Sequence, residues 1–131
     1  MLPASQFSDT LTPNQVLLVE DEPIIRMMLA EELRAVGLKV VEASNADEAW
    51  SFLQAGGKPD LIVTDITMPG SMNGTELMTR VIQTYPYIKR IITSANPGPR
   101  NILELGRFLP KPYRLEAAAK MALDMLRLNQ A

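Results

Sequence analysis

The sequence contains neither cysteine nor histidine. Without cysteine there is no disulfide framework, no thiolate metal site and no thiol nucleophile. Without histidine there is no zinc site of the hydrolase type, no imidazole base and no Ser-His-Asp triad. Any functional site must therefore be built from the remaining polar and charged side chains.

Long apolar runs and a strong charge imbalance are also lacking. No run of about 18 apolar residues occurs, so we expect no transmembrane helix. The stretch from Met1 to Asn14 has neither the basic nor the apolar part of a secretory signal. The formal net charge is −2, and no basic recognition helix is visible, which argues against direct nucleic-acid binding. We therefore expect a cytoplasmic protein without membrane contact.

The composition is that of one ordinary globular domain. Of the 131 residues, 47% are hydrophobic and 21% are charged, which excludes disordered and collagen-like chains. Pro3 and Pro13, with scattered serines and threonines, indicate a flexible tail over residues 1–14. We expect a single domain over residues 15–131 and no separate output domain.

Short apolar runs alternate with helical stripes along that domain. The runs at 16–19 and 61–64 are typical of strands buried on both faces. The full pattern predicts strands at 16–19, 38–42, 61–64, 88–93 and 108–109, and helices at 23–36, 46–53, 77–85 and 114–128 with a short helix before Gly106. Such alternation favours an α/β fold, a doubly wound parallel sheet with right-handed crossovers and helices on both faces.

Polar side chains stand at the ends of four predicted strands. Glu20 and Asp21 follow the first strand, Asp65 the third, Ser94 the fourth and Lys111 the fifth. Ligands of doubly wound sheets bind at the carboxyl ends of the strands. We therefore expect these five side chains to form the functional site.

The chemistry of this set points to phosphoryl transfer. Three crowded carboxylates repel one another, so they require a proton or a cation. Oxygen ligands without histidine or cysteine suit Mg²⁺ better than zinc. Lys111 supplies a compact positive charge for a phosphoryl group, and Ser94 supplies a hydroxyl. A nucleophilic carboxylate, a metal, a lysine and a hydroxyl are the parts that phosphoryl transfer to a carboxylate needs.

These residues resemble the receiver domain of two-component response regulators, the class that includes the stand-alone chemotaxis receiver. The matching pieces are Glu20-Asp21, Asp65 with Met68-Pro69 and Gly74, Ser94-Ala95, and Lys111-Pro112. The resemblance extends from about Gln15 to Leu128. Each piece alone is common, but all of them occur in the right order and the acidic, hydroxyl and lysine residues each stand at a predicted strand end.

The resemblance implies a fold and a function. The fold is flavodoxin-like, with five parallel strands in the order 2-1-3-4-5. Asp65 is then the phosphoacceptor, which attacks a phosphohistidine of a histidine kinase or a histidine phosphotransfer protein and becomes an aspartyl phosphate. Such a chain is not a classical enzyme, although it assists its own phosphorylation and dephosphorylation. It signals to a downstream protein target or passes the phosphoryl group along a relay.

The resemblance also assigns roles around Asp65. Asp21 ligates Mg²⁺ directly, Glu20 acts through water, and Asp65 and the carbonyl of Thr67 complete the protein ligands. Lys111 pairs with the phosphoryl oxygens, and its bond to Pro112 is usually cis.

A switch and two departures complete the implied picture. Ser94 moves toward the phosphoryl group and Phe108 swings inward, in a two-state switch. The interval from Ser94 to Lys111 is short and contains Asn96-Pro97-Gly98-Pro99, so we expect a shortened or irregular fourth helix. Thr67 and Asn96, which flank the acceptor in the family, are not carboxylates, so we expect no very fast self-dephosphorylation.

The last predicted helix carries two apolar stripes. One consists of Leu115, Ala119, Ala122, Leu123 and Leu126, and the other of Met121, Met125 and Leu128. Packing on a sheet needs only one stripe. The second stripe has two interpretations, a frayed end with tolerated apolar residues or a surface for a partner or a homodimer.

Two other functions stay open as alternatives. An Mg²⁺-dependent phosphatase of the haloacid-dehalogenase type also uses an aspartate nucleophile, but it requires a second aspartate two residues later, where this chain has Thr67. An unphosphorylated pseudo-receiver would bind partners only, and it would need a broken acceptor set, whereas this set is intact.

Overall fold

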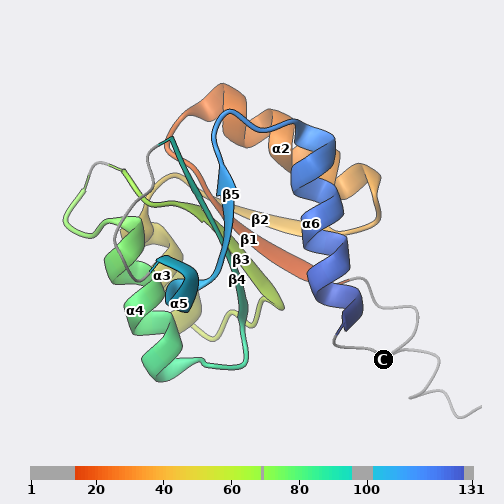
Figure 1. Cartoon of the computed structure of the whole chain (residues 1–131). Coiled ribbons are helices and arrows are strands. Elements are labelled where there is room, and N and C mark those ends of the chain that lie inside the picture. Colours follow the sequence, from red (N-terminus) through yellow and green to blue (C-terminus); the bar gives the residue numbers. More distant parts are fainter. Residues whose placement is uncertain (1–13, 69, 96–101, 129–131) are drawn as a thin grey trace, which may run out of the picture.

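The computed structural model describes residues 14–68, 70–95 and 102–128 (Figure 1). The predicted tail over residues 1–14 lies outside this part except for Asn14, and so does the predicted irregular stretch Asn96–Pro99. Among the helices within the described ranges, none is long and apolar enough to cross a membrane.

Five parallel strands form the centre of the molecule. They are β1 (Gln15–Val19), β2 (Lys39–Ala43), β3 (Leu61–Asp65), β4 (Lys89–Ser94) and β5 (Arg107–Pro110). Their order across the sheet is β2-β1-β3-β4-β5, so β2 and β5 are the outer strands. The predicted strand order is confirmed, and each predicted strand lies within one residue of an observed one or inside it.

Helices cover both faces of the sheet. They are α2 (Pro23–Ala35), α3 (Ala46–Gln54), α4 (Gly74–Thr84), α5 (Ile102–Leu105) and α6 (Leu115–Leu128). Figure 1 shows α2 and α6 on one face and α3, α4 and α5 on the other. The helix between β4 and β5 is the four-residue α5, which agrees with the expected shortened fourth helix.

The helix ends follow from local side-chain chemistry. Asn45 caps α3 by accepting a hydrogen bond from the Glu48 amide (2.8 Å), as its position predicts. Pro23 stands in the first turn of α2, where its missing amide proton costs nothing. Gly37 follows α2 with φ of +95°, a conformation that favours glycine. These signals explain why the helix ends were readable from the sequence.

The buried residues form two clusters, one on each face of the sheet. Side chains of a strand alternate between faces, so Leu17, Ile62 and Ile92 enter the cluster under α3, α4 and α5. Their neighbours Leu18, Val63 and Ile91 enter the cluster under α2 and α6. Both faces are therefore apolar, as the continuous apolar runs predicted.

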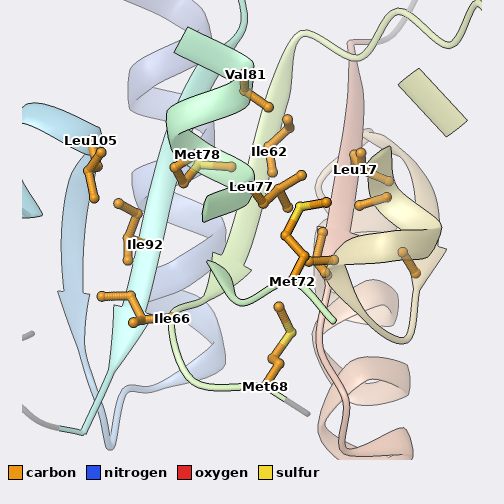
Figure 2. Close-up of a cluster of buried hydrophobic side chains, with 14 of the residues drawn as sticks. Leu17, Ile62, Ile66, Met68, Met72, Leu77, Met78, Val81, Ile92 and Leu105 are labelled. Atoms are coloured by element: carbon orange, nitrogen blue, oxygen red, sulfur yellow. The ribbon is translucent and has the colours of Figure 1, made fainter. Parts of the chain in front are cut away.

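The connection from β3 to α4 is more buried than its sequence indicates. Met68 and Met72 are 7% and 4% exposed, and Figure 2 shows both side chains among the buried residues beneath α4. The sequence predicted only a loop with turn residues at this place. Because this connection begins at Asp65, its burial anchors one side of the predicted site.

The second apolar stripe of α6 lies along the rim of a cluster. Met121 and Met125 are half-buried and pack against the cluster under α2 and α6. The side chain of Leu128 lies outside the described part of the chain. Part of each methionine reaches the surface, and the use of this stripe for a partner or a homodimer stays a prediction.

Candidate functional site

All the strand ends named by the sequence meet at one edge of the sheet. β3 ends at Asp65, which pairs with Thr93 of β4, and Ser94 pairs with Pro110 of β5. Glu20 follows β1, and its amide donates a hydrogen bond to the carbonyl of Ala43 at the end of β2 (3.1 Å). The parallel sheet thereby gathers side chains that are far apart in the sequence.

Three carboxylates are crowded at this edge. One oxygen from each of Glu20, Asp21 and Asp65 lies within 4.8 Å of the others. Glu20 and Asp65 are only 3% and 8% exposed, so water screens their repulsion weakly. We call these three residues the acidic cluster. Its donors are all carboxylate oxygens, a set that fits a hard divalent cation such as Mg²⁺.

Among the residues that the structure describes, Lys111 is the positively charged side chain that contacts the carboxylates of the acidic cluster. Its Nζ donates a hydrogen bond to Oδ2 of Asp65 (2.5 Å) and lies 3.5 Å from Oε1 of Glu20. Burial by itself lowers the pKa of Lys111, but the hydrogen bond to Asp65 and the charges of Glu20 and Asp65 outweigh it and raise that pKa. The ammonium group is therefore charged at neutral pH.

Glu20 has an environment that opposes its ionisation. Burial is the largest cause and raises the pKa of its carboxyl, and the neighbours Asp21 and Asp65 add to the rise. The hydrogen bond from the Glu22 amide (3.2 Å) and the charge of Lys111 lower the pKa without reversing the change. Without a bound cation, the charge on Glu20 therefore reduces the stability of the fold.

Replacing Glu20 by glutamine should stabilise the cation-free protein. In the wild type the folded state holds the Glu20 proton more tightly than the unfolded state. The protonated Glu20 carboxyl therefore contributes its whole stabilisation below the pKa that this group has in the unfolded chain. The contribution is lost as the pH rises through its pKa in the folded protein. In urea unfolding at pH 8 with EDTA, the free energy of unfolding of Glu20→Gln should exceed that of wild type by about 1 kcal/mol.

The pH dependence and a matched variant check this result. The difference between Glu20→Gln and wild type should shrink toward pH 4, where both side chains are neutral. Glu31→Gln, at an exposed position on α2, should show no such trend. A Glu20→Gln protein less stable than wild type at pH 8 would contradict the stated effect of burial.

Thr67 and Ser94 complete the walls around Asp65. The amide of Thr67 donates a hydrogen bond to Oδ1 of Asp65 (3.2 Å). Ser94 is 4% exposed, and its carbonyl accepts a hydrogen bond from the Lys111 amide (2.8 Å). Together with Asp65, Ala95 and Lys111, these residues line a cavity of about 210 Å³. The bond between Lys111 and Pro112 is cis, as the resemblance implied.

Gly74 allows α4 to begin directly against the end of β3. A Cβ atom at position 74 would lie 2.1 Å from the carbonyl oxygen of Asp65 and 2.8 Å from the Cα atom of Ile66. The Gly74 amide also donates a hydrogen bond to the carbonyl of Ile66 (2.9 Å). The main chain that carries Asp65 is therefore held by a contact that only glycine permits.

Phe108 is not among the residues that line the cavity around Asp65. It is half-buried on β5, pairs in register with Ile92 of β4, and packs against the cluster under α3, α4 and α5. Asn96, the other predicted residue near the acceptor, lies outside the described residues.

The sequence analysis missed two residues at this edge. The Nη1 atom of Arg26 donates a hydrogen bond to the main-chain carbonyl of Glu20 (2.8 Å). Burial raises the pKa of the Tyr113 phenol, and the charge of Glu20 adds to this rise. The position of Tyr113 two residues after Lys111 is a signal that could have found it. No sequence signal shows that Arg26 reaches back to Glu20.

An apolar surface adjoins the polar cavity. A second cavity of about 330 Å³ is lined by Ile25, Met28, Ala95, Lys111, Pro112, Tyr113 and Leu115. It shares Ala95 and Lys111 with the cavity around Asp65. Met28, which lines this cavity, is 46% exposed, and Ile24 and Met27 on the same helix α2 are 68% and 52% exposed. Large apolar side chains thus lie at the surface next to the acidic cluster.

Comparison with known proteins gives consistent matches. Residues 16–122 match the family described as "Response regulator receiver domain". The chain is 44% identical over 115 residues to the transcriptional regulatory protein PdtaR of Mycobacterium tuberculosis, covering 82% of this chain and 54% of that protein. It is 37% identical over 117 residues to the sensor kinase CckA of Brucella abortus, covering 85% of this chain and 12% of the kinase. The chain therefore spans about half, or much less, of these relatives.

A solved structure agrees with the sequence matches. The response regulator protein TrrA of Thermotoga maritima, solved in complex with Mg(2+)-BeF, superposes with a TM-score of 0.76 at 28% identity. The match covers 85% of this chain and 97% of that one.

Proposed function

Because this chain belongs to the response regulator receiver domain family, we propose that Asp65 accepts a phosphoryl group from a histidine kinase or a histidine phosphotransfer protein. The observation that carries the proposal is the hydrogen bond between Asp65 and Lys111 within the acidic cluster. The buried carboxylate and its lysine face a cavity of about 210 Å³, which can admit a phosphoryl group. The chain then acts as a phosphoacceptor switch in a two-component system.

The proposed step is a displacement at phosphorus. A carboxylate oxygen of Asp65 forms a bond to the phosphorus of a phosphohistidine, while the P–N bond breaks and its electron pair returns to the imidazole. The product is an aspartyl phosphate. Lys111 moves from the carboxylate to the phosphoryl oxygens, and the Ser94 hydroxyl donates a hydrogen bond to them. The Thr67 amide keeps the Asp65 carboxylate oriented.

Mg²⁺ is the proposed cofactor. Glu20, Asp21 and Asp65 supply the oxygen donors that fit it, and by the family resemblance Asp21 binds directly, Glu20 binds through water and Thr67 contributes its carbonyl. The cation supplies positive charge against the phosphoryl oxygens. The TrrA complex with Mg(2+)-BeF supports this choice.

The output is a change of protein contacts or onward relay. We propose that Ser94 moves toward the phosphoryl group and that Phe108, now half-buried on β5, swings further inward. A new dianionic group biases such a two-state packing arrangement. The downstream target is a protein and not a nucleic acid, and we place the chain in the cytoplasm with its donor.

The apolar surface of α2 favours a protein donor over a small one. Met27 is 52% exposed on α2, the helix whose Ile25 and Met28 line the cavity that shares Lys111 with the cavity around Asp65. A donor protein has to approach this edge of the sheet. We expect Met27→Glu to reduce phosphotransfer from the cognate kinase about tenfold, because it introduces a charge into an apolar contact. Labelling by acetyl phosphate should change less than twofold, since this donor does not touch α2.

Matched variants separate docking from folding. Tyr87→Glu alters another exposed apolar residue, 61% exposed, before β4 at the opposite end of the strands, and it should leave both reactions unchanged. Equal loss of both reactions in Met27→Glu would argue against a docking role for this surface. Kinase transfer at the wild-type rate would do the same.

Labelling tests the function as a whole. The full chain with Mg²⁺ and radioactive acetyl phosphate should gain one acid-stable, base-labile label. Profiling against the host's histidine kinases and phosphotransfer proteins should then reveal one that transfers fastest. Absence of label from every donor would favour the pseudo-receiver, which binds partners only. Repeated turnover of a generic phosphomonoester would favour the phosphatase of the haloacid-dehalogenase type.

A further inference from the structure

Arg26 links Glu20 of the acidic cluster to β2, one of the two outer strands of the sheet. It stands on α2, and its guanidinium donates a hydrogen bond from Nη1 to the carbonyl of Glu20 (2.8 Å). Its Nε lies 3.6 Å from Oε1 of Glu42 on β2. The side chain is 20% exposed, so this contact is partly protected from water. Arg26 therefore bridges the loop after β1 and the strand β2.

The Glu20 carbonyl is a point from which Asp21 can be controlled. That carbonyl belongs to the planar peptide unit that joins Glu20 to Asp21. The Glu20 amide is already fixed by the carbonyl of Ala43 (3.1 Å). When both the amide and the carbonyl of Glu20 are held, the Cα atom of Asp21 has little freedom. The orientation of the Asp21 carboxylate within the acidic cluster then depends on the guanidinium of Arg26.

We infer that Arg26 is a positioning residue of the acidic cluster, which fixes the peptide between Glu20 and Asp21 and thereby raises the affinity for a divalent cation. The inference rests on the proposed function only in naming Mg²⁺ as that cation. Groups that orient metal ligands without touching the metal typically change affinity 10–100-fold when they are removed.

The direction in which Mg²⁺ affinity changes when Arg26 is replaced distinguishes a positioning role from a purely electrostatic one. An arginine near three carboxylates repels an incoming cation, so removal of its charge should strengthen Mg²⁺ binding if charge alone mattered. Positioning predicts the opposite, because the freed peptide lets Asp21 turn away. Arg26→Gln should therefore bind Mg²⁺ about tenfold more weakly than wild type.

Arg34 provides a matched control on the same helix. Its Nη2 lies 3.3 Å from Oε2 of Glu42 and donates to the carbonyl of Val40 (3.1 Å). It thus shares Glu42 with Arg26, while its own hydrogen bonds and ion pair join it to Val40 and Glu42 of β2 and not to Glu20. Arg34→Gln should keep the wild-type Mg²⁺ affinity within about twofold, since the charge that it removes stands on a more exposed side chain, 48% against 20% for Arg26, and is screened more strongly.

A conservative variant adds a second test. Arg26→Lys keeps the charge, but one ammonium group replaces the planar fork that serves both Glu20 and Glu42. Its Mg²⁺ affinity should lie between wild type and Arg26→Gln. Charge alone predicts wild-type affinity for the lysine variant, so this variant decides the matter if the glutamine variant does not fold.

The measurement is calorimetric titration of MgCl₂ into the metal-free full chain, with amide NMR shifts of Asp21 and Thr67 as a second readout. Weaker binding by Arg26→Gln, with Arg34→Gln unchanged, supports the inference. Binding by Arg26→Gln that equals or exceeds wild type overturns it, and so does equal weakening in both variants.

Phosphorylation kinetics separate this inference from the proposed function. With acetyl phosphate, Arg26→Gln should need about ten times more Mg²⁺ for half-maximal labelling and should reach the wild-type maximal rate. A lower maximal rate at saturating Mg²⁺ would assign Arg26 to the transfer step and overturn the inference. If wild type takes no label at all, the proposed function fails while the calorimetric comparison still decides the role of Arg26.

Discussion

Asp65→Asn should take no phosphoryl label, from a phosphorylated kinase or from acetyl phosphate. The neutral amide oxygen is a poor nucleophile, and no other carboxylate of the acidic cluster has the same hydrogen bond to Lys111. Asparagine has almost the same volume as aspartate, so the variant should fold. Label is measured by gel autoradiography after denaturation, and it should fall to background, a loss of at least about 10³-fold.

A carboxylate outside the site provides the control. Asp124 on α6 pairs with Lys120 across one helical turn (3.3 Å), and Asp124→Asn should be labelled like wild type. Undiminished labelling of Asp65→Asn would refute the assignment of the acceptor. Label that moves to Glu20 or Asp21 in the variant, located by peptide mapping, would mean that the cavity is right and the nucleophile is wrong.

Gly74→Ala should destabilise the fold by about 3 kcal/mol. A change from glycine to alanine within a helix normally stabilises by up to about 1 kcal/mol. At this position the added Cβ would lie 2.1 Å from the carbonyl oxygen of Asp65, and main chain cannot yield as a flexible side chain can. Either α4 or the end of β3 has to shift, so labelling of Asp65 should weaken as well.

Urea unfolding of Gly74→Ala and Thr79→Ala checks this expectation. Thr79 is exposed on the same helix, and its change to alanine should alter the free energy of unfolding by less than about 0.5 kcal/mol. Stability of Gly74→Ala within 1 kcal/mol of wild type, with normal labelling, would show that α4 moves away from β3 at little cost.

The sheet and its edge were predictable because their signals are local. The two central strands β1 and β3 read as apolar runs, at 16–19 and 61–64, and an acidic residue follows each run directly in the sequence. Parallel strands place their carboxyl ends together, so the proximity of Asp21 and Asp65 follows from topology alone. The sequence could thus indicate which carboxylates form the acidic cluster, although it contains no interatomic distances.

The supports of the site were not predictable in the same way. The role of Gly74 depends on the distance of α4 from β3, and the burial of Met68 and Met72 depends on how their connection folds back. Arg26 reaches a main-chain carbonyl, and every residue carries such a carbonyl, so no residue type marks the partner. Such contacts are set by tertiary packing and leave no periodic signal.

The last helix shows a limit of helical-wheel reasoning. Met121 and Met125 fall well round from the stripe of Ala119 and Ala122 on the wheel, yet both are half-buried against the same cluster. A methionine side chain is long and flexible, so it bends toward the core from a flanking position. The wheel treats each residue as a direction from the axis and cannot represent this reach.

The two outer strands also determine how the molecule behaves when it is concentrated. An unpaired strand edge is a template for aggregation with other chains. Here β2 carries Lys39 and Glu42 at the surface, and β5 carries Arg107 and Pro110. Charges and a proline without an amide proton oppose the addition of a foreign strand at either edge. Growth of the sheet into fibrils is thereby disfavoured, and two copies that associate should do so through side chains rather than through backbone pairing.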